Sequence, residues 1–127
     1  MKKVLGVDIG GTKIRMGVVN EQGEVLIDKT IPTILPLYPY LEEQILAIMN
    51  DVPDISGIGI GTRGMVDAAT GVITFETEMP GWQGTPVKAL LEAATGLPVE
   101  INIDANRAAL AEARLGAAAG FKQVVCL

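Results

Sequence analysis

The chain has 127 residues and a net charge of −5, which indicate one domain without the basic surface that nucleic-acid binding requires. Apolar residues make up 49% of the sequence, yet no apolar run is long enough to span a bilayer or to act as a secretory segment. One cysteine, Cys126, and no histidine are present, which excludes an internal disulfide, Ser-His-Asp or Cys-His catalysis and histidine-based zinc sites. We therefore expect a cytoplasmic protein without nucleic-acid or membrane partners, in which Asp and Glu accept protons.

The sequence predicts an antiparallel meander of three strands followed by alternating helices and strands. The meander rests on β-branched apolar runs separated by glycine-containing turns, and the later helices rest on apolar residues at helical spacing. Prolines at 32, 36 and 39 interrupt regular structure until about Tyr40, Thr85-Pro86 begins a helix with threonine as its cap, and Gly96 ends it. This order predicts an α/β fold, a mixed sheet of about five strands with flanking helices. The expected strands are 4–9, 14–19, 24–31, 55–60, 65–73 (strand, turn, strand), 99–103 and the opening of one at 124–127, and the expected helices are 40–52, 85–96 and 105–119.

The turn between the first two strands carries the best clue to function. Gly10 and Gly11 lack Cβ atoms, so backbone N–H groups can converge on an anionic oxygen, and Thr12 and Lys13 add a hydroxyl and a positive charge. Asp8 beside them suits a divalent cation that sits between carboxylate and phosphate. The pattern indicates metal-assisted binding of a nucleotide phosphate. A hairpin turn that needs two glycines for their φ values is the open alternative.

A second glycine-rich segment resembles a dinucleotide-binding fingerprint. Residues 59–64 read Gly-Ile-Gly-Thr-Arg-Gly directly after a predicted strand. Such a fingerprint must open a helix whose N-terminus faces the pyrophosphate, whereas residues 65–73 read as strand, turn and strand. We therefore interpret these glycines as positions where backbone approaches a small ligand closely.

Asp104 is the second chemical centre. It follows the strand at 99–103 and precedes the alanine-rich helix, and the carboxyl ends of strands are where α/β proteins usually bind ligands. A helix N-terminus favours the ionised carboxylate, which suits a proton acceptor, and Asn106 lies two residues further on. The open alternative is that Asp104 is an ordinary N-cap, a role compatible with the first.

Together these segments resemble the amino-terminal lobe of the ROK family (repressors, open reading frames and kinases), over essentially all 127 residues. Kinases of this family resemble bacterial glucokinases, with a two-lobed, actin-like ATPase (ribonuclease H-like) fold in which sugar and ATP meet in the cleft. We expect residues 1–120 to form this lobe and 121–127 to begin the carboxy-terminal lobe. The segments that carry the resemblance are Asp8 to Lys13, Gly57 to Thr62, Gly64 to Asp67, Gly71 to Ile73, Pro80 to Trp82 and Asp104 to Asn106.

The resemblance implies roles for particular residues. Gly10, Gly11, Thr12 and Lys13 would bind nucleotide phosphate, with Asp8 near Mg²⁺. Asp104 would be the catalytic base that takes the proton of a sugar hydroxyl as it attacks the γ-phosphate of ATP. The sugar site would include Gly64, Glu78 and Asp104, with the turn from Glu78 to Trp82 lining it.

Three positions depart from the family pattern. Many members have proline at Arg63 and asparagine at both Glu78 and Ile103, and those asparagines usually hydrogen-bond the sugar. A carboxylate at Glu78 accepts a hydrogen bond but donates none, and isoleucine does neither. The hexose is therefore open, and reduced or lost catalysis is compatible with these residues.

The apolar end of the sequence, Val124 to Leu127, reads as an interrupted strand, with a final strand completing the sheet as the alternative. The second phosphate loop, the adenosine pocket and the family's histidine-cysteine zinc motif would then lie beyond it. We expect the isolated lobe to be inactive, and the resemblance leaves a homodimer open. A noncatalytic sugar-sensing module is the second hypothesis. A ROK-type transcriptional regulator is disfavoured, because only three residues precede Val4.

Overall fold

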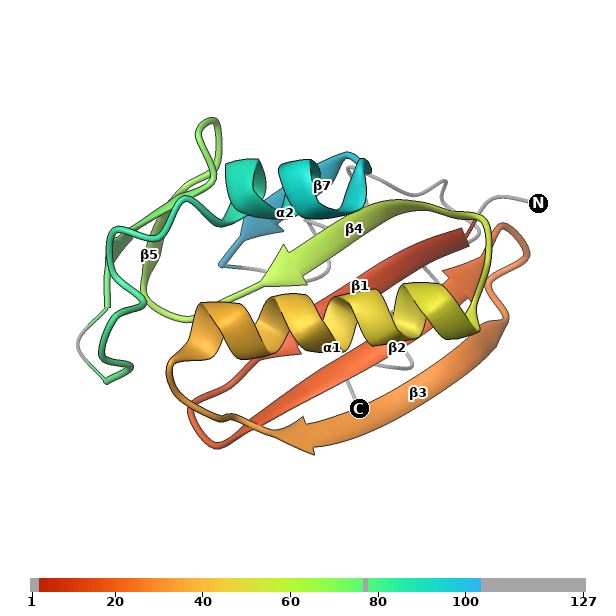
Figure 1. The fold of residues 1–127 in the computed structure, drawn as a ribbon, viewed down its shortest axis with the longest axis horizontal. Coiled ribbons are helices and arrows are strands. Elements are labelled where there is room, and N and C mark those ends of the chain that lie inside the picture. The colour runs from red at the N-terminus through yellow and green to blue at the C-terminus, as the bar shows by residue number, and fades with distance from the viewer. Residues whose placement is uncertain (1–2, 77, 104–127) are drawn as a thin grey trace.

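The computed structural model describes residues 3–76 and 78–103. Seven strands and two helices occur within these ranges (Figure 1). No helix in this part of the chain is long and apolar enough to cross a bilayer. The elements are β1 (Lys3–Ile9), β2 (Lys13–Asn20), β3 (Val25–Pro32), α1 (Leu37–Asp51), β4 (Ile55–Gly61), β5 (Met65–Asp67), β6 (Val72–Phe75), α2 (Val87–Thr95) and β7 (Val99–Asn102).

A mixed five-stranded sheet with the order β3-β2-β1-β4-β7 forms the centre of the structure. The meander β1-β2-β3 is antiparallel, as predicted, whereas β4 lies parallel to both β1 and β7. β5 and β6 form a separate antiparallel hairpin. Within the described residues, the predicted α/β fold and the predicted mixed sheet of about five strands are therefore confirmed.

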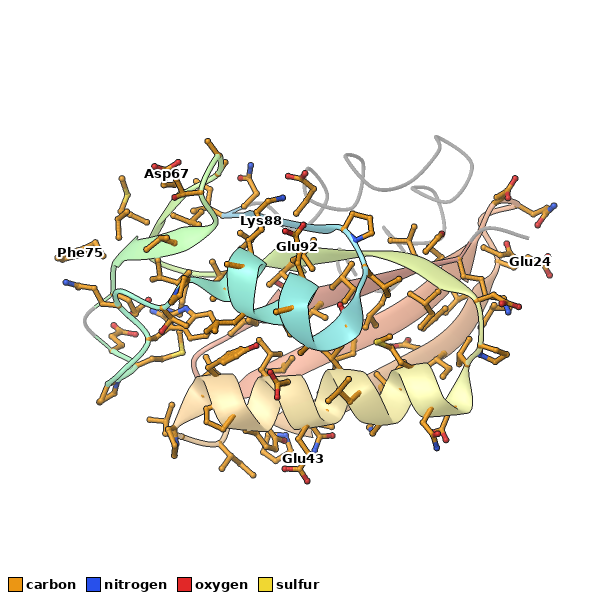
Figure 2. All side chains as sticks on the ribbon, turned by 45° about the horizontal axis from the view of Figure 1, so that its top comes forward. Glu24, Glu43, Asp67, Phe75, Lys88 and Glu92 are labelled. Carbon is orange, nitrogen blue, oxygen red and sulfur yellow. The ribbon has the colours of Figure 1, made fainter. Side chains whose placement is uncertain are left out.

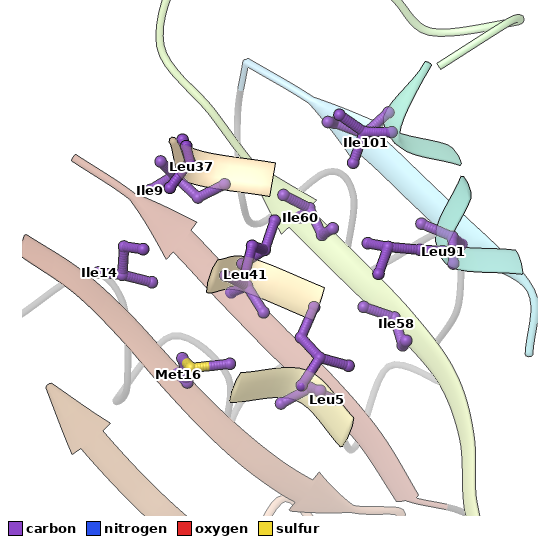
Figure 3. Packing of buried hydrophobic residues seen from close by; sticks show 14 of the residues in the cluster. Leu5, Ile9, Ile14, Met16, Leu37, Leu41, Ile58, Ile60, Leu91 and Ile101 are labelled. Carbon is purple, nitrogen blue, oxygen red and sulfur yellow. The ribbon is translucent and has the colours of Figure 1, made fainter. Parts of the chain in front are cut away.

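Both helices cover the same face of the sheet, as Figure 1 shows. The side chains that α1 buries, Leu37, Leu41, Ile45 and Ile48, recur every three or four residues and so form one stripe. Leu5 and Ile9 of β1 meet this stripe (Figure 3). Because successive strand residues point to opposite faces, Asp8 belongs to the other face of the sheet. The predicted apolar periodicity of this helix is confirmed.

Two predicted helix starts are wrong. α1 begins at Leu37 rather than near Tyr40, because Pro39 lies in the first turn, where a backbone N–H has no partner within the helix. α2 begins at Val87, and its N-terminal flank carries no side-chain cap. The hydroxyl of Thr85 instead donates to the carbonyl of Gly81 at 3.0 Å. The predicted end at Gly96 is confirmed, with a φ of 72°.

Candidate functional site

The carboxyl ends of β1, β4 and β7 lie at one edge of the sheet. Asp8 pairs with Gly61, and Gly61 in turn pairs with Asn102. The Thr62 N–H then donates to the Asn102 carbonyl at 3.0 Å. In Figure 1 the arrowheads of these three strands point toward the end of the molecule where β5 lies. Asp104, the predicted base, lies outside the described residues, but the strand that leads to it ends at this edge.

The turn after β1 is held by hydrogen bonds to the end of β3. The Gly10 N–H donates to the Lys13 carbonyl at 2.9 Å. Thr33 donates from its hydroxyl to the Gly10 carbonyl at 2.9 Å and from its N–H to the Thr12 carbonyl at 3.0 Å. Among the described residues, the N–H groups of Gly11 and Thr12 have no hydrogen-bond acceptor. These two N–H groups, rather than that of Gly10, are therefore the ones available to an anion.

The two glycines of this turn are needed for space and not for positive φ. Neither Gly10 nor Gly11 has a backbone conformation in the left-handed region, which contradicts the alternative that the turn needs them for their φ values. A Cβ atom on Gly10 would lie 2.9 Å from the Lys13 carbonyl oxygen. A Cβ atom on Gly11 would lie 2.6 Å from Nη1 of Arg63. Gly11 therefore makes room for a guanidinium group that comes from the end of β4.

Asp8 is a half-buried carboxyl group whose pKa is raised by burial. Arg15 lies opposite it on β2, but the Arg15 guanidinium donates two hydrogen bonds to Asp28, at 3.0 and 2.8 Å. These bonds lower the pKa of Asp28 and raise that of Arg15. A cation beside Asp8 would stabilise its ionised form. A single half-buried carboxylate next to a phosphate turn is a donor set that suits Mg²⁺, which usually keeps waters and takes further oxygens from phosphate.

Gly64 lies where the chain leaves β4 for the hairpin. It has a φ of 84°, which favours glycine, and a Cβ atom there would collide with the Phe75 carbonyl oxygen. The same Cβ would lie 2.9 Å from Oε2 of Glu76. Within the described residues, the close approach that the sequence suggested for this glycine is thus to the chain's own backbone.

A cluster of three charged side chains, Arg63, Glu76 and Glu78, lies between the hairpin and the turn after β1. Nη2 of Arg63 lies 2.5 Å from Oε2 of Glu78, and Nε lies 3.8 Å from Oε2 of Glu76. The Glu76 side chain is 4% exposed, and its Oε1 accepts the Glu78 N–H at 2.7 Å. Sequence reasoning missed Glu76. The signal lay in the hairpin, because pairing Met65 with Phe75 brings the residues on either side together.

Trp82 fixes the segment that follows this cluster. Its ring is 1% exposed, and its Nε1 donates to the hydroxyl of Thr62 at 3.1 Å. The turn from Glu78 to Trp82 is the one expected to line the sugar site, and its last side chain, Trp82, belongs to the hydrophobic core. Ile103, one of the three positions that depart from the expected family pattern, is 63% exposed.

Comparisons with known proteins agree with this architecture. A glucokinase from Streptomyces coelicolor is 38% identical across the whole chain, which spans 40% of that relative's length. A beta-glucoside kinase from Listeria innocua is 35% identical over 98% of the chain and 42% of its own length. The crystal structure of a ROK family glucokinase from Streptomyces griseus, in complex with glucose and AMPPNP, superposes with a TM-score of 0.69. It is 37% identical over 90% of this chain and 37% of its own chain.

These solved structures share the actin-like ATPase fold, which confirms the expected fold class. The ROK family model itself matches residues 4–127, almost the entire sequence. The chain therefore belongs to the ROK family.

Proposed function

We propose that the chain is the amino-terminal lobe of an ATP-dependent hexose kinase similar to glucokinases. The observation that carries the proposal is the shared edge of the sheet. The glycine turn follows β1 at this edge, and β7, the strand that leads to Asp104, ends there as well. Kinase relatives at 35 to 38% identity support the same reading.

In this function the turn from Gly10 to Lys13 binds the phosphates of ATP. The N–H groups of Gly11 and Thr12, together with the Lys13 ammonium, supply donors and positive charge. Asp8 would hold Mg²⁺, which when bound neutralises developing charge on the phosphate oxygens. Positioning and charge neutralisation account for most of the acceleration in phosphoryl transfer.

Asp104 acts as the general base. It accepts the proton of the sugar hydroxyl as the hydroxyl oxygen attacks the γ-phosphorus, and the bond from that phosphorus to the bridging oxygen of ADP breaks. Gly64 and Glu78 belong to the sugar side of the site. General-base catalysis is typically worth about 10² to 10⁴ in rate.

The chain spans about 40% of the length of the curated relatives that it matches. We propose residues 1–120 as the lobe and residues 121–127 as the beginning of a carboxy-terminal lobe that completes the ATP site. A cytoplasmic location and a homodimer are part of the same proposal. The 127-residue chain alone should show no sugar phosphorylation, and ATP-dependent turnover of glucose by it would contradict this expectation.

Replacement of Asp104 by asparagine in the two-lobed protein tests the function. Turnover, measured as hexose-dependent release of ADP, should fall by about 10² to 10⁴, while hexose affinity measured by calorimetry should stay unchanged. Asp51→Asn is the matched control, because Asp51 is exposed at the end of α1, next to the amino end of β4. Equal turnover in the Asp104→Asn and Asp51→Asn variants would refute the proposed base.

A noncatalytic sugar-sensing module is the second candidate. The ion pair between Arg63 and Glu78 favours this candidate, because the Glu78 carboxylate is already bound at a position where we expect many family members to have a sugar-binding asparagine. A sensor binds hexose but has no turnover that Asp104→Asn could reduce. The same pair of assays therefore separates the two functions.

A further inference from the structure

The Arg63 guanidinium lies against the proposed phosphate turn, next to Gly11. Arg63 follows the carboxyl end of β4 by two residues, and its Nη1 occupies the space that a side chain at Gly11 would take. Nη1 is thus on the same side of the turn as the missing Cβ atom. The exposed side chain of Thr12 and the N–H groups of Gly11 and Thr12 belong to the same turn.

The other nitrogen atoms of Arg63 are held unequally by two carboxylates. Glu76 is almost fully buried and is fixed at both ends: its N–H donates to Oε1 of Gln83 at 3.0 Å, and its Oε1 accepts the Glu78 N–H. Glu78 is 63% exposed, so water solvates its carboxylate when it leaves the guanidinium. Glu76 therefore stays in place as a buried negative charge 3.8 Å from Nε of Arg63, whereas Glu78 is an exposed partner that another anion can replace.

An arginine held in this way is suited to a phosphate. Its planar guanidinium offers five donors in a rigid fork that matches phosphate oxygens bidentately. Water weakens the exposed pair of Arg63 with Glu78, and a phosphate offers the guanidinium more negative charge and more acceptor oxygens than one carboxylate does. Exchange of the Glu78 carboxylate for a phosphate oxygen is therefore favourable.

We propose that Arg63 is an anion-binding residue of the phosphate turn: its guanidinium binds the terminal phosphate of a polyphosphate chain and releases Glu78 as it does so. This inference rests on the proposed role of residues 10–13 as a phosphate loop. It assigns Arg63 to the transferred phosphate and not to the sugar, and it makes Glu78 a competitor of the ligand.

Binding of inorganic tripolyphosphate by the 127-residue chain tests the proposal. Trp82 is the only tryptophan, and its ring donates to Thr62, the neighbour of Arg63, so its fluorescence reports on the site and calorimetry measures the affinity. Arg63→Ala should weaken binding about tenfold or more, because a bond to a charged group is lost. Glu78→Gln should strengthen binding by about two- to fivefold, because the competing carboxylate becomes neutral.

Two charge-matched controls separate this local effect from the net charge. Lys29→Ala removes a positive charge from an exposed position on β3, and Glu43→Gln removes a negative charge from the outer side of α1, where Figure 2 shows the side chain pointing away from the sheet. Both controls should leave the affinity unchanged at constant ionic strength.

The opposite signs of the two site variants are the critical result. Arg63→Ala with the same affinity as Lys29→Ala, or Glu78→Gln that binds no more tightly than Glu43→Gln, would overturn the proposal, as would the absence of tripolyphosphate binding by the parent chain. Loss of tripolyphosphate binding in Lys13→Ala but not in Arg63→Ala would refute the proposed role of Arg63 and support the phosphate-binding role of the turn. If Arg63→Ala weakens binding and Glu78→Gln strengthens it while the Asp104→Asn variant of the two-lobed protein stays active, the role of Arg63 is supported and the proposed base is refuted.

Discussion

Replacement of Thr62 by valine should destabilise the folded chain by removing a buried hydroxyl group, which accepts one hydrogen bond and donates another to the Arg63 carbonyl at 3.3 Å. The Thr62 hydroxyl accepts a hydrogen bond from Nε1 of Trp82 at 3.1 Å, and both residues are at least 96% buried, with 4% and 1% exposure. Valine keeps the shape and leaves the indole N–H without an acceptor. An unsatisfied buried donor costs about 1 to 3 kcal/mol, so the free energy of unfolding should fall by that amount.

Urea denaturation followed by circular dichroism measures this loss, and Thr62→Ser is the control that keeps the hydroxyl. The cycle with Trp82→Phe isolates the pairwise term, since phenylalanine removes the donor and makes valine at position 62 less costly. We expect a coupling energy of about 0.5 kcal/mol or more between the two positions. Strictly additive effects, or a Thr62→Val variant as stable as the parent chain, would refute the reasoning.

Three further substitutions test the turn and Asp8. Gly10→Ala places a Cβ atom 2.9 Å from the backbone carbonyl oxygen of Lys13 and should destabilise the chain by about 1 to 3 kcal/mol. Gly11→Ala meets only the flexible end of the Arg63 side chain and should cost less stability. Equal losses of stability in the two variants, measured by thermal unfolding, would contradict this order. Because burial raises the pKa of Asp8, its ionised form costs stability at neutral pH and its protonated form does not. Asp8→Asn should therefore raise the free energy of unfolding at neutral pH. The difference in this free energy between variant and parent should shrink as the pH falls through the raised pKa of Asp8. A difference in urea unfolding that does not change with pH would contradict this prediction.

Hydrophobic periodicity predicted the described elements because it reports on burial directly. The meander, α1 and the strands between the helices each bury one stripe or face. Their apolar patterns can therefore be recognised in the sequence without knowledge of the neighbouring elements. The helix starts were less predictable. Pro39 is compatible with both a loop and a first helical turn, and Thr85 is satisfied by Gly81, a contact that depends on the loop conformation.

The functional edge could be predicted only in part. Parallel strands must end together, so the sequence could place the segments after β1, β4 and β7 at one edge of the sheet. The sequence flagged Arg63 and Glu78 separately as departures from a family pattern. It could not show that they form one ion pair, or that Glu76 supports it, because these contacts depend on the pairing of β5 with β6 and on the path of the chain after it.

The contacts of residues 62–64 differ enough in strength to decide which of them a ligand can change. The hydrogen bond from Trp82 to Thr62 is buried, and breaking it costs about 1 to 3 kcal/mol. Gly64 fits against the Phe75 carbonyl in a conformation that favours glycine, so this contact holds the backbone in place. The ion pair of Arg63 with Glu78 is exposed and worth about 0.2 to 1 kcal/mol. A ligand at the glycine turn should therefore move the Arg63 side chain first and leave the backbone around it unchanged.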